Sequence, residues 1–183
     1  MGADEQELLE IIRRRSFRTG EFTLASGAKS NLYFNLKPTM MDPRGARLCA
    51  QAFLARLPEG TDYVGGLEMG AVPIIAALEA ISDIQGKPVK TIFVRKAPKS
   101  HGTQDVIEGL GPDETLNGKH VVMVDDVATS GGSMWKSIEA VRAAGAVVDL
   151  AMSVVDRQEG ATEFLAERGV RLEAVLKAGD FFG

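Results

Sequence analysis

The segment 121–133 contains the residues with the clearest chemical meaning. Four apolar residues typical of a buried strand precede Asp125 and Asp126, and a loop of small residues then leads into a helix. Backbone N–H groups at a helix N-terminus bind phosphate, and Gly131 and Gly132 let the backbone approach such a ligand closely. Two adjacent carboxylates suit a ribose diol and favour positive charge developing on a sugar carbon. The segment therefore predicts a ribose-phosphate site rather than a loop that only caps a helix.

Other phosphate-binding loops fit the sequence less well. A Walker loop needs Gly-Lys-Ser or Gly-Lys-Thr at the start of a helix, and no such tripeptide follows a predicted strand. The nearest approach to a dinucleotide fingerprint is Gly109-Leu110-Gly111, which opens no strand-helix-strand unit. These absences argue against kinase and dehydrogenase functions.

A second segment combines basic residues with glycines. Arg95, Lys96, Lys99 and His101 follow a predicted strand at 91–94 and enter a loop that carries proline and glycine. Basic runs are often simply solvated. Beside a ribose-phosphate motif, however, such a loop can neutralise a departing pyrophosphate and close over it to exclude water.

The elements that must position these segments alternate between helices and short strands, which predicts an α/β fold with a doubly wound, mainly parallel five-stranded sheet flanked by helices. Ligands of such sheets bind at the carboxyl ends of the strands. Short strands within 17–40 predict a small N-terminal hood, formed by residues 1–41 of a single domain that spans 1–183. The strands are expected at 63–64, 91–94, 121–124, 147–155 and 172–176. The helices are expected at about 7–15, 43–57, 72–84, 133–144 and 161–168. Asp42 is expected to cap the second helix, which begins at Pro43.

The composition narrows the environment and the partners. The chain has 183 residues, a formal net charge of -4 and a sequence pI near 5.3, so no overall cationic field attracts nucleic acid or an anionic membrane. Its N-terminus is acidic where a signal peptide is basic, which predicts a cytoplasmic protein. Cys49 is the sole cysteine and is expected in the core, and with two histidines a zinc site is not expected.

Segment 121–133 resembles the phosphoribosyl pyrophosphate signature of the type I phosphoribosyltransferases. The basic segment is similar to the catalytic loop of the orotate phosphoribosyltransferases, including Arg-Lys, the second lysine, His-Gly and the later Ile107-Glu108-Gly109. Residues 22–35 resemble that family's substrate loop and hood, and 156–160 resemble its segment after the next strand. The resemblance covers nearly the whole chain and narrows the base to orotate.

This resemblance implies transfer of ribose 5-phosphate from phosphoribosyl pyrophosphate to orotate in pyrimidine (UMP) biosynthesis, giving orotidine 5'-phosphate and pyrophosphate. It also implies substrate-bound Mg²⁺ without direct protein ligands, and a homodimer whose catalytic loop reaches the neighbouring site, with no nucleic acid or membrane partner. The expected catalytic residues are Lys99, His101, Asp125 and Asp126. Phosphoribosyl pyrophosphate is expected to contact Arg95, Lys96, Lys99, His101, Asp125, Asp126, Val127, Ala128, Thr129, Ser130, Gly131, Gly132 and Ser133, and orotate is expected to contact Thr129, Arg157 and Phe34.

Two departures from the family pattern keep alternatives open. A lysine common before the Ser-Gly of the substrate loop is replaced by Ala25, and the glycine turn 65–70 lacks a further lysine. Lys29 or Lys37 could compensate. The alternatives are a phosphoribosyltransferase for a purine or another base and, less favoured, a non-catalytic sensor of phosphoribosyl pyrophosphate.

Overall fold

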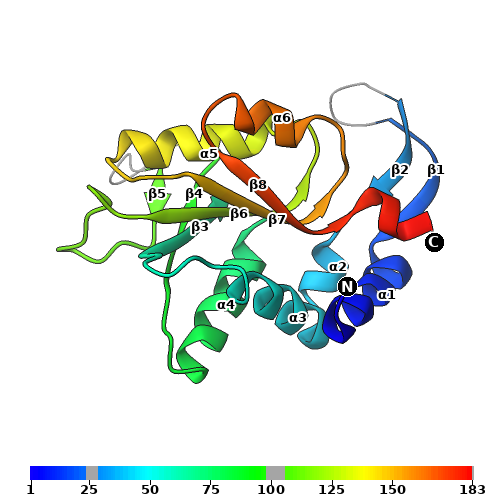
Figure 1. The fold of residues 1–183 in the computed structure, drawn as a ribbon, viewed down its shortest axis with the longest axis horizontal. Coiled ribbons are helices and arrows are strands. Elements are labelled where there is room, and N and C mark those ends of the chain that lie inside the picture. The colour runs from blue at the N-terminus through cyan, green and yellow to red at the C-terminus, as the bar shows by residue number, and fades with distance from the viewer. Residues whose placement is uncertain (24–28, 98–105, 183) are drawn as a thin grey trace.

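A computed structural model describes residues 1–23, 29–97 and 106–182, and within these residues it contains a six-stranded sheet with helices on both faces. Helices α1 to α4 cover one face, and α5 and α6 cover the other (Figure 1). The strands are β1 (Phe17–Thr23), β2 (Lys29–Phe34), β3 (Tyr63–Leu67), β4 (Lys90–Val94), β5 (Ile107–Glu108), β6 (Val121–Ala128), β7 (Leu150–Asp156) and β8 (Arg171–Lys177). The helices are α1 (Ala3–Arg15), α2 (Lys37–Met40), α3 (Pro43–Leu54), α4 (Val72–Ile84), α5 (Gly132–Ala143) and α6 (Ala161–Ala166), with a final 3₁₀ helix η1 (Ala178–Phe182).

The order of strands in the main sheet is β5-β4-β3-β6-β7-β8. The five predicted strands are present and mutually parallel, which confirms the doubly wound α/β class. The short strand β5 adds an antiparallel edge that was not predicted. It has two residues, too few to show any hydrophobic periodicity.

Several predicted boundaries were wrong, and three of them have a clear physical reason. Residues 37–40 form α2 instead of a strand, since Pro38 cannot donate a ladder hydrogen bond but is compatible with a first helical turn. Helix α3 ends at Leu54, before Pro58. Strand β6 continues through the two aspartates to Ala128, because β7 pairs with it along this whole stretch. The predicted cap of α3 is confirmed, since Asp42 accepts hydrogen bonds from the N–H groups of the next helical turn.

Alternation along β6 builds a hydrophobic core on each face of the sheet. Val122 and Val124 pack with buried residues of α1, α3 and α4, while Val121 and Met123 pack with those of α5 and α6. Cys49 is fully buried, as expected, and burial raises the pKa of its thiol to about 12. In the described part of the chain, no helix is long and apolar enough to cross a membrane.

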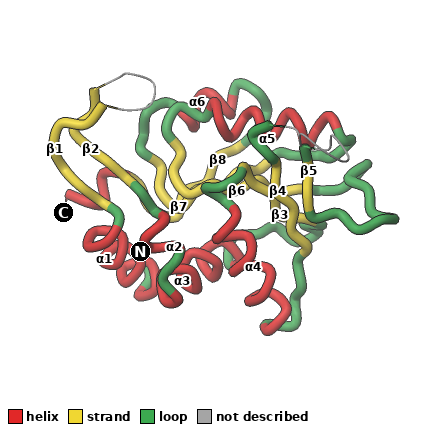
Figure 2. The backbone as a smooth tube through the Cα atoms, turned by 180° about the vertical axis from the view of Figure 1, so that it is seen from behind, coloured by secondary structure: helices red, strands yellow, loops and turns green. Residues whose placement is uncertain are grey.

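Strands β1 and β2 form a separate two-stranded sheet at one side of the molecule, next to the C-terminus (Figure 2). An aromatic cluster joins this hairpin to the C-terminal segment. The Phe17 ring lies 4.9 Å from that of Phe34 and 5.1 Å from that of Phe181, measured between centroids. Phe34 and Phe181 are 5.0 Å apart in an edge-to-face arrangement, which is a favourable geometry for aromatic pairs. This packing attaches the hairpin to the C-terminal helix η1.

Helix α2 is firmly attached to its surroundings although it is short. Leu36, Thr39 and Met40 are buried, and the Thr39 hydroxyl lies 2.7 Å from the Ser16 hydroxyl in a buried hydrogen bond. Helix α3 approaches so closely that a Cβ at Gly45 would lie 2.2 Å from the Thr39 carbonyl oxygen. The position of α2 is therefore fixed by contacts on two sides.

The hydrogen bond between Ser16 and Thr39 should show energetic coupling. Ser16→Ala and Thr39→Val should each lower the free energy of unfolding by about 1–3 kcal/mol, because each removes one hydroxyl of the pair and leaves the other buried without its hydrogen-bond partner. The double variant should lose less than the sum of the two. Urea denaturation measures all three. Thr61→Val, which removes an exposed local hydrogen bond, is the matched control and should change stability little. Strict additivity would show that the pair is not coupled.

Candidate active site

The carboxyl ends of β3, β4 and β6 meet at one edge of the sheet. From β3 the chain continues to β4 on one side and returns to β6 on the other, which makes this edge the topological switch point where such sheets bind ligands. A cleft of about 390 Å³ lies here. It is lined by Lys37, Leu67, Glu68, Met69, Gly70, Lys96, Asp125, Asp126, Val127 and Ser133.

Asp125 and Asp126 form the acidic wall of the cleft. Asp125 is 9% exposed, and its Oδ1 accepts a hydrogen bond of 2.9 Å from the N–H of Asp126, whose own Oδ1 accepts one of 2.9 Å from Val127. Burial, and then the negative charge of Asp126, raise the pKa of Asp125 well above its usual value, while Lys96 opposes the shift. A site of this kind attracts a cation and can accept protons.

Gly70 faces the two carboxylates with bare backbone. A Cβ at this position would lie 2.8 Å from Asp125 Oδ1 and 3.0 Å from Asp126 Oδ1. The loop after β3 therefore approaches the acids so closely that a side chain at this residue would collide with them.

The loop between β6 and α5 has the geometry expected of a phosphate site. Gly131 adopts a φ of 82°, which glycine tolerates best, and it precedes the first turn of α5. A Cβ there would lie 3.0 Å from the ring of Phe164, so α6 packs against the loop. Thr129 accepts a backbone hydrogen bond of 3.1 Å from Ala161. Ser133 is exposed toward the cleft, beside N–H groups that have no acceptor within the helix.

The loop after β3 is tied to the end of β4. The N–H of Glu68 donates to the carbonyl oxygen of Val94 at 2.9 Å, and Glu68 Oε1 accepts from the N–H of Lys96 at 2.8 Å. The peptide bond between Glu68 and Met69 is cis. The two hydrogen bonds hold Lys96 at the cleft.

Arg95 occupies a different environment from Lys96. Its guanidinium lies 3.7 Å from Glu108 Oε1 on β5, and its N–H donates to the Val106 carbonyl oxygen at 2.7 Å. The side chain therefore links β4 to β5, and it does not line the cleft as the structure describes it.

Five of the predicted site residues line the cleft, whereas Arg95, Arg157 and Phe34 do not. Those that line the cleft are Lys96, Asp125, Asp126, Val127 and Ser133, with Ala128, Thr129, Ser130, Gly131 and Gly132 between them on the same segment. Arg157 is buried after β7, and its guanidinium forms a 2.6 Å ion pair with Glu159. Phe34 belongs to the aromatic cluster. Lys99 and His101 lie outside the described residues.

The sequence assignments did not include Glu68, Met69 and Gly70, and Lys37 was considered only as a substitute cation. The first three follow the first parallel strand, so the rule that places ligands at strand ends could have identified them. Lys37 does not follow a strand of the main sheet, so the same rule could not have identified it.

A second cavity, of about 480 Å³, lies at the opposite edge of the sheet and includes His120, Asp149 and Arg171. It is larger, but it adjoins the amino ends of the strands, away from the aspartates. We therefore assign function to the smaller cleft. Within residues 1–23, 29–97 and 106–182, no three His, Cys, Asp or Glu side chains are grouped as a metal site.

The raised pKa of Asp125 has a consequence for stability. The pKa of Asp125 in the folded state is above the unfolded value of about 3.9, so the folded protein keeps this proton to a higher pH than the unfolded chain does. Wild type therefore loses stability as the pH rises from the unfolded-state pKa to the folded-state pKa. Asp125→Asn should therefore gain stability relative to wild type between pH 4 and neutrality, as measured by urea denaturation.

Asp62 provides a control of opposite sign. A hydrogen bond from the His120 N–H, and then one from Lys119, lower the pKa of Asp62, so its contribution is present above pH 4 and lost in acid. Asp62→Asn should be less stable than wild type by a nearly constant amount between about pH 4 and neutrality, and the difference should shrink as the pH falls below about 4. A pH-independent difference for Asp125→Asn would contradict the assignment.

Comparison with known proteins identifies the family of the chain. Residues 41–169 match the family model described as the phosphoribosyl transferase domain. An orotate phosphoribosyltransferase of Bradyrhizobium sp. strain BTAi1 is 57% identical over 180 residues, which cover 98% of this chain and 97% of the relative. One from Nostoc sp. strain PCC 7120 is 38% identical, over 96% of this chain and 84% of the relative.

Solved structures give the same result. The orotate phosphoribosyltransferase of Mycobacterium tuberculosis in complex with Fe(III) dicitrate has a TM-score of 0.81 and 34% identity, covering 98% of this chain and 99% of that one. The same enzyme in complex with phosphoribosyl pyrophosphate has a TM-score of 0.77 and 31% identity, covering 97% and 98%. By its fold, its family match and its near-complete alignment with these relatives, the chain belongs to the orotate phosphoribosyltransferase family.

Proposed function

We propose that the protein transfers the ribose 5-phosphate group of phosphoribosyl pyrophosphate to N1 of orotate, forming orotidine 5'-phosphate and pyrophosphate in UMP biosynthesis. The observation that carries this proposal is the pair of buried Asp125 and half-buried Asp126 beside the first turn of α5, with Lys96 on the same cleft. The relatives named orotate phosphoribosyltransferase match the chain over nearly its full length, which favours orotate over a purine as the base.

The two ends of the sugar meet different parts of the site. The N–H groups at the start of α5, with the hydroxyls of Thr129, Ser130 and Ser133, bind the 5'-phosphate. Asp125 and Asp126 accept hydrogen bonds from the ribose hydroxyls. Their negative charge stabilises the anomeric carbon as its bond to pyrophosphate breaks and its bond to N1 of orotate forms, with inversion.

The proton that leaves N1 of orotate requires a base. The raised pKa of Asp125 makes it a better proton acceptor than an ordinary carboxylate, and His101 is the other candidate. A base tuned toward neutral pH is the more effective catalyst, so burial of Asp125 serves this step as well as charge stabilisation.

Mg²⁺ fits the cleft as a substrate-bound ion. It prefers oxygen ligands and usually keeps several waters, binding through one or two carboxylates and the phosphates of its substrate. Asp125 and Asp126 can hold it through its waters or through the ribose hydroxyls, without a dedicated metal cage. When bound, the ion neutralises the pyrophosphate.

Lys96, together with Lys99 and His101, stabilises the departing pyrophosphate, whereas Arg95 pairs with Glu108 and does not line the cleft. By family resemblance, the loop that carries Lys99 and His101 acts in the neighbouring subunit's site, and the protein is a homodimer. A cytoplasmic location suits a chain whose single cysteine is buried as a free thiol. No basic face for nucleic acid is expected at a net charge of -4.

The first test is orotate consumption. With phosphoribosyl pyrophosphate and magnesium, wild type should remove the ultraviolet absorbance of orotate, and Lys99→Ala should lower kcat about a hundredfold or more, because a cation at developing charge is lost. Turnover with adenine, guanine or hypoxanthine but not orotate would identify a purine enzyme instead. Binding of phosphoribosyl pyrophosphate without turnover of any base would favour the sensor.

Arg157 provides a test of the base. Replacing it with Gln should raise the KM for orotate about tenfold or more and leave the KM for phosphoribosyl pyrophosphate unchanged, because a charge-assisted hydrogen bond to the orotate carboxylate is lost. Arg171→Gln, on the exposed outer strand β8, is the matched control. An unchanged KM for orotate in a folded Arg157→Gln protein would show that the arginine serves only its ion pair with Glu159.

A further inference from the structure

We propose that Lys37, at the start of α2, binds the pyrophosphate group of phosphoribosyl pyrophosphate, a role that rests on the activity proposed above. Residues 65–70, which end β3 and form the turn after it, contain no lysine or arginine, and their one ionisable side chain is the carboxylate of Glu68. At Gly70 a side chain would collide with Asp125 and Asp126. A cation for this part of the cleft must therefore come from another element.

The charges around the cleft show why a further cation matters. Three carboxylates line it, from Glu68, Asp125 and Asp126, against two lysines, Lys37 and Lys96. A pyrophosphate placed here meets repulsion from the acids, which the magnesium ion and the lysines must offset. Removing either lysine would leave one cationic side chain among the described residues that line the cleft.

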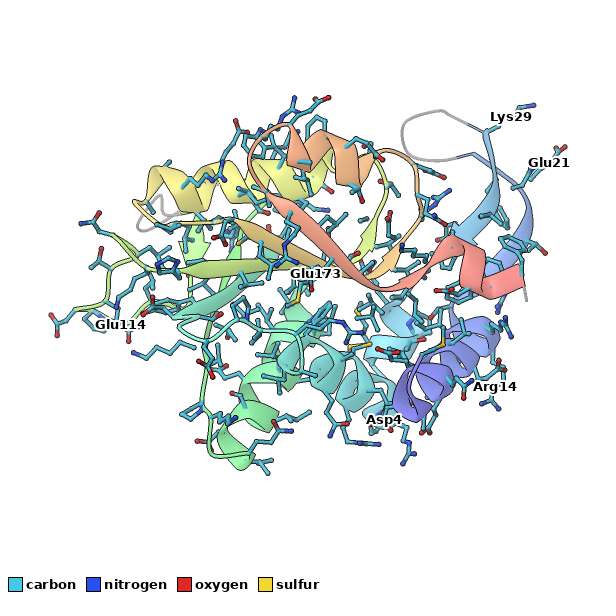
Figure 3. All side chains as sticks on the ribbon, viewed as in Figure 1. Asp4, Arg14, Glu21, Lys29, Glu114 and Glu173 are labelled. Atoms are coloured by element: carbon cyan, nitrogen blue, oxygen red, sulfur yellow. The ribbon has the colours of Figure 1, made fainter. Side chains whose placement is uncertain are left out.

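Lys37 is available for a ligand. It forms no ion pair with any other residue in the described part of the chain, and its side chain is exposed. Arg95, by contrast, is paired with Glu108. Lys29 lies at the outer end of the hairpin, with its side chain directed away from the sheet (Figure 3). Of these three cations, Lys37 is the one that lines the cleft.

The backbone of α2 holds Lys37 in place. The residue before it, Leu36, is fully buried, and Thr39 and Met40 anchor the helix from the other side. The N–H of Lys37 donates to Asn35 Oδ1 at 3.3 Å. A flexible side chain on a fixed backbone can reach a ligand at little cost in ordering the chain, which is the arrangement expected of a binding residue.

The test compares Lys37→Gln with Lys37→Arg in the full-length protein. Lys37→Gln should raise the KM for phosphoribosyl pyrophosphate and the Kd for magnesium pyrophosphate, measured by calorimetry, about tenfold, which corresponds to about 1.4 kcal/mol. The KM for orotate should stay unchanged, and Lys37→Arg should restore most of the binding. The melting temperature should not move, because the side chain is exposed and forms no ion pair with the residues that the structure describes.

Two further variants make the result decisive. Lys87→Gln, exposed between α4 and β4, is the matched control and should alter each constant by less than about twofold. Unchanged pyrophosphate binding in Lys37→Gln would overturn the inference, as would a loss that appears in Lys29→Gln instead or a rise confined to the KM for orotate. Wild type that binds pyrophosphate but does not consume orotate would refute the proposed function and leave the Lys37 result interpretable.

Discussion

The structure depends on one electrostatic constraint, the two adjacent carboxylates near the carboxyl end of the central strand β6, one of them buried. Charge is costly in such surroundings unless hydrogen bonds or opposite charges compensate it. Here two backbone N–H groups and the nearby Lys96 compensate in part, and the pKa of Asp125 stays raised. The two carboxylates are thus electrostatically unfavourable by themselves, and a cationic sugar carbon or a magnesium ion relieves their repulsion. A ligand-free fold that tolerates this arrangement sacrifices some stability for function.

The same edge of the sheet brings together segments that are far apart in the chain. Gly66 pairs with Phe93 on one side and Val124 on the other, so β3 and β4 end beside the point from which β6 continues to the aspartates. A Cβ at Gly66 would lie 2.1 Å from the Cβ of Ala71 and 2.5 Å from the Val124 carbonyl oxygen. Only a residue without a side chain allows α4 to start so close to the strands. The turn at Gly70 can then contact the aspartates.

Local sequence patterns predicted the repeated strand-helix units and the segment 121–133, because hydrophobic periodicity and glycine placement are local properties. They did not predict contacts that only the folded chain creates. The hydrogen bond from the Lys96 N–H to Glu68 joins residues 28 apart, and the ion pair between Arg95 and Glu108 depends on the two-residue strand β5. Helix α2 was mistaken for a strand because its helical form depends on buried contacts made elsewhere.

These tertiary contacts change how the basic segment should be understood. In the sequence, Arg95 and Lys96 are equivalent members of a run of cations, yet one pairs with an acid on β5 and the other lines the cleft. Counting charges along the chain therefore overestimates the cations available to a ligand here. The carboxylate of Glu68 also has a structural use, since it holds the Lys96 backbone. A cleft with three acids can serve a polyanionic substrate because the position of each charge, rather than their sum, determines what binds.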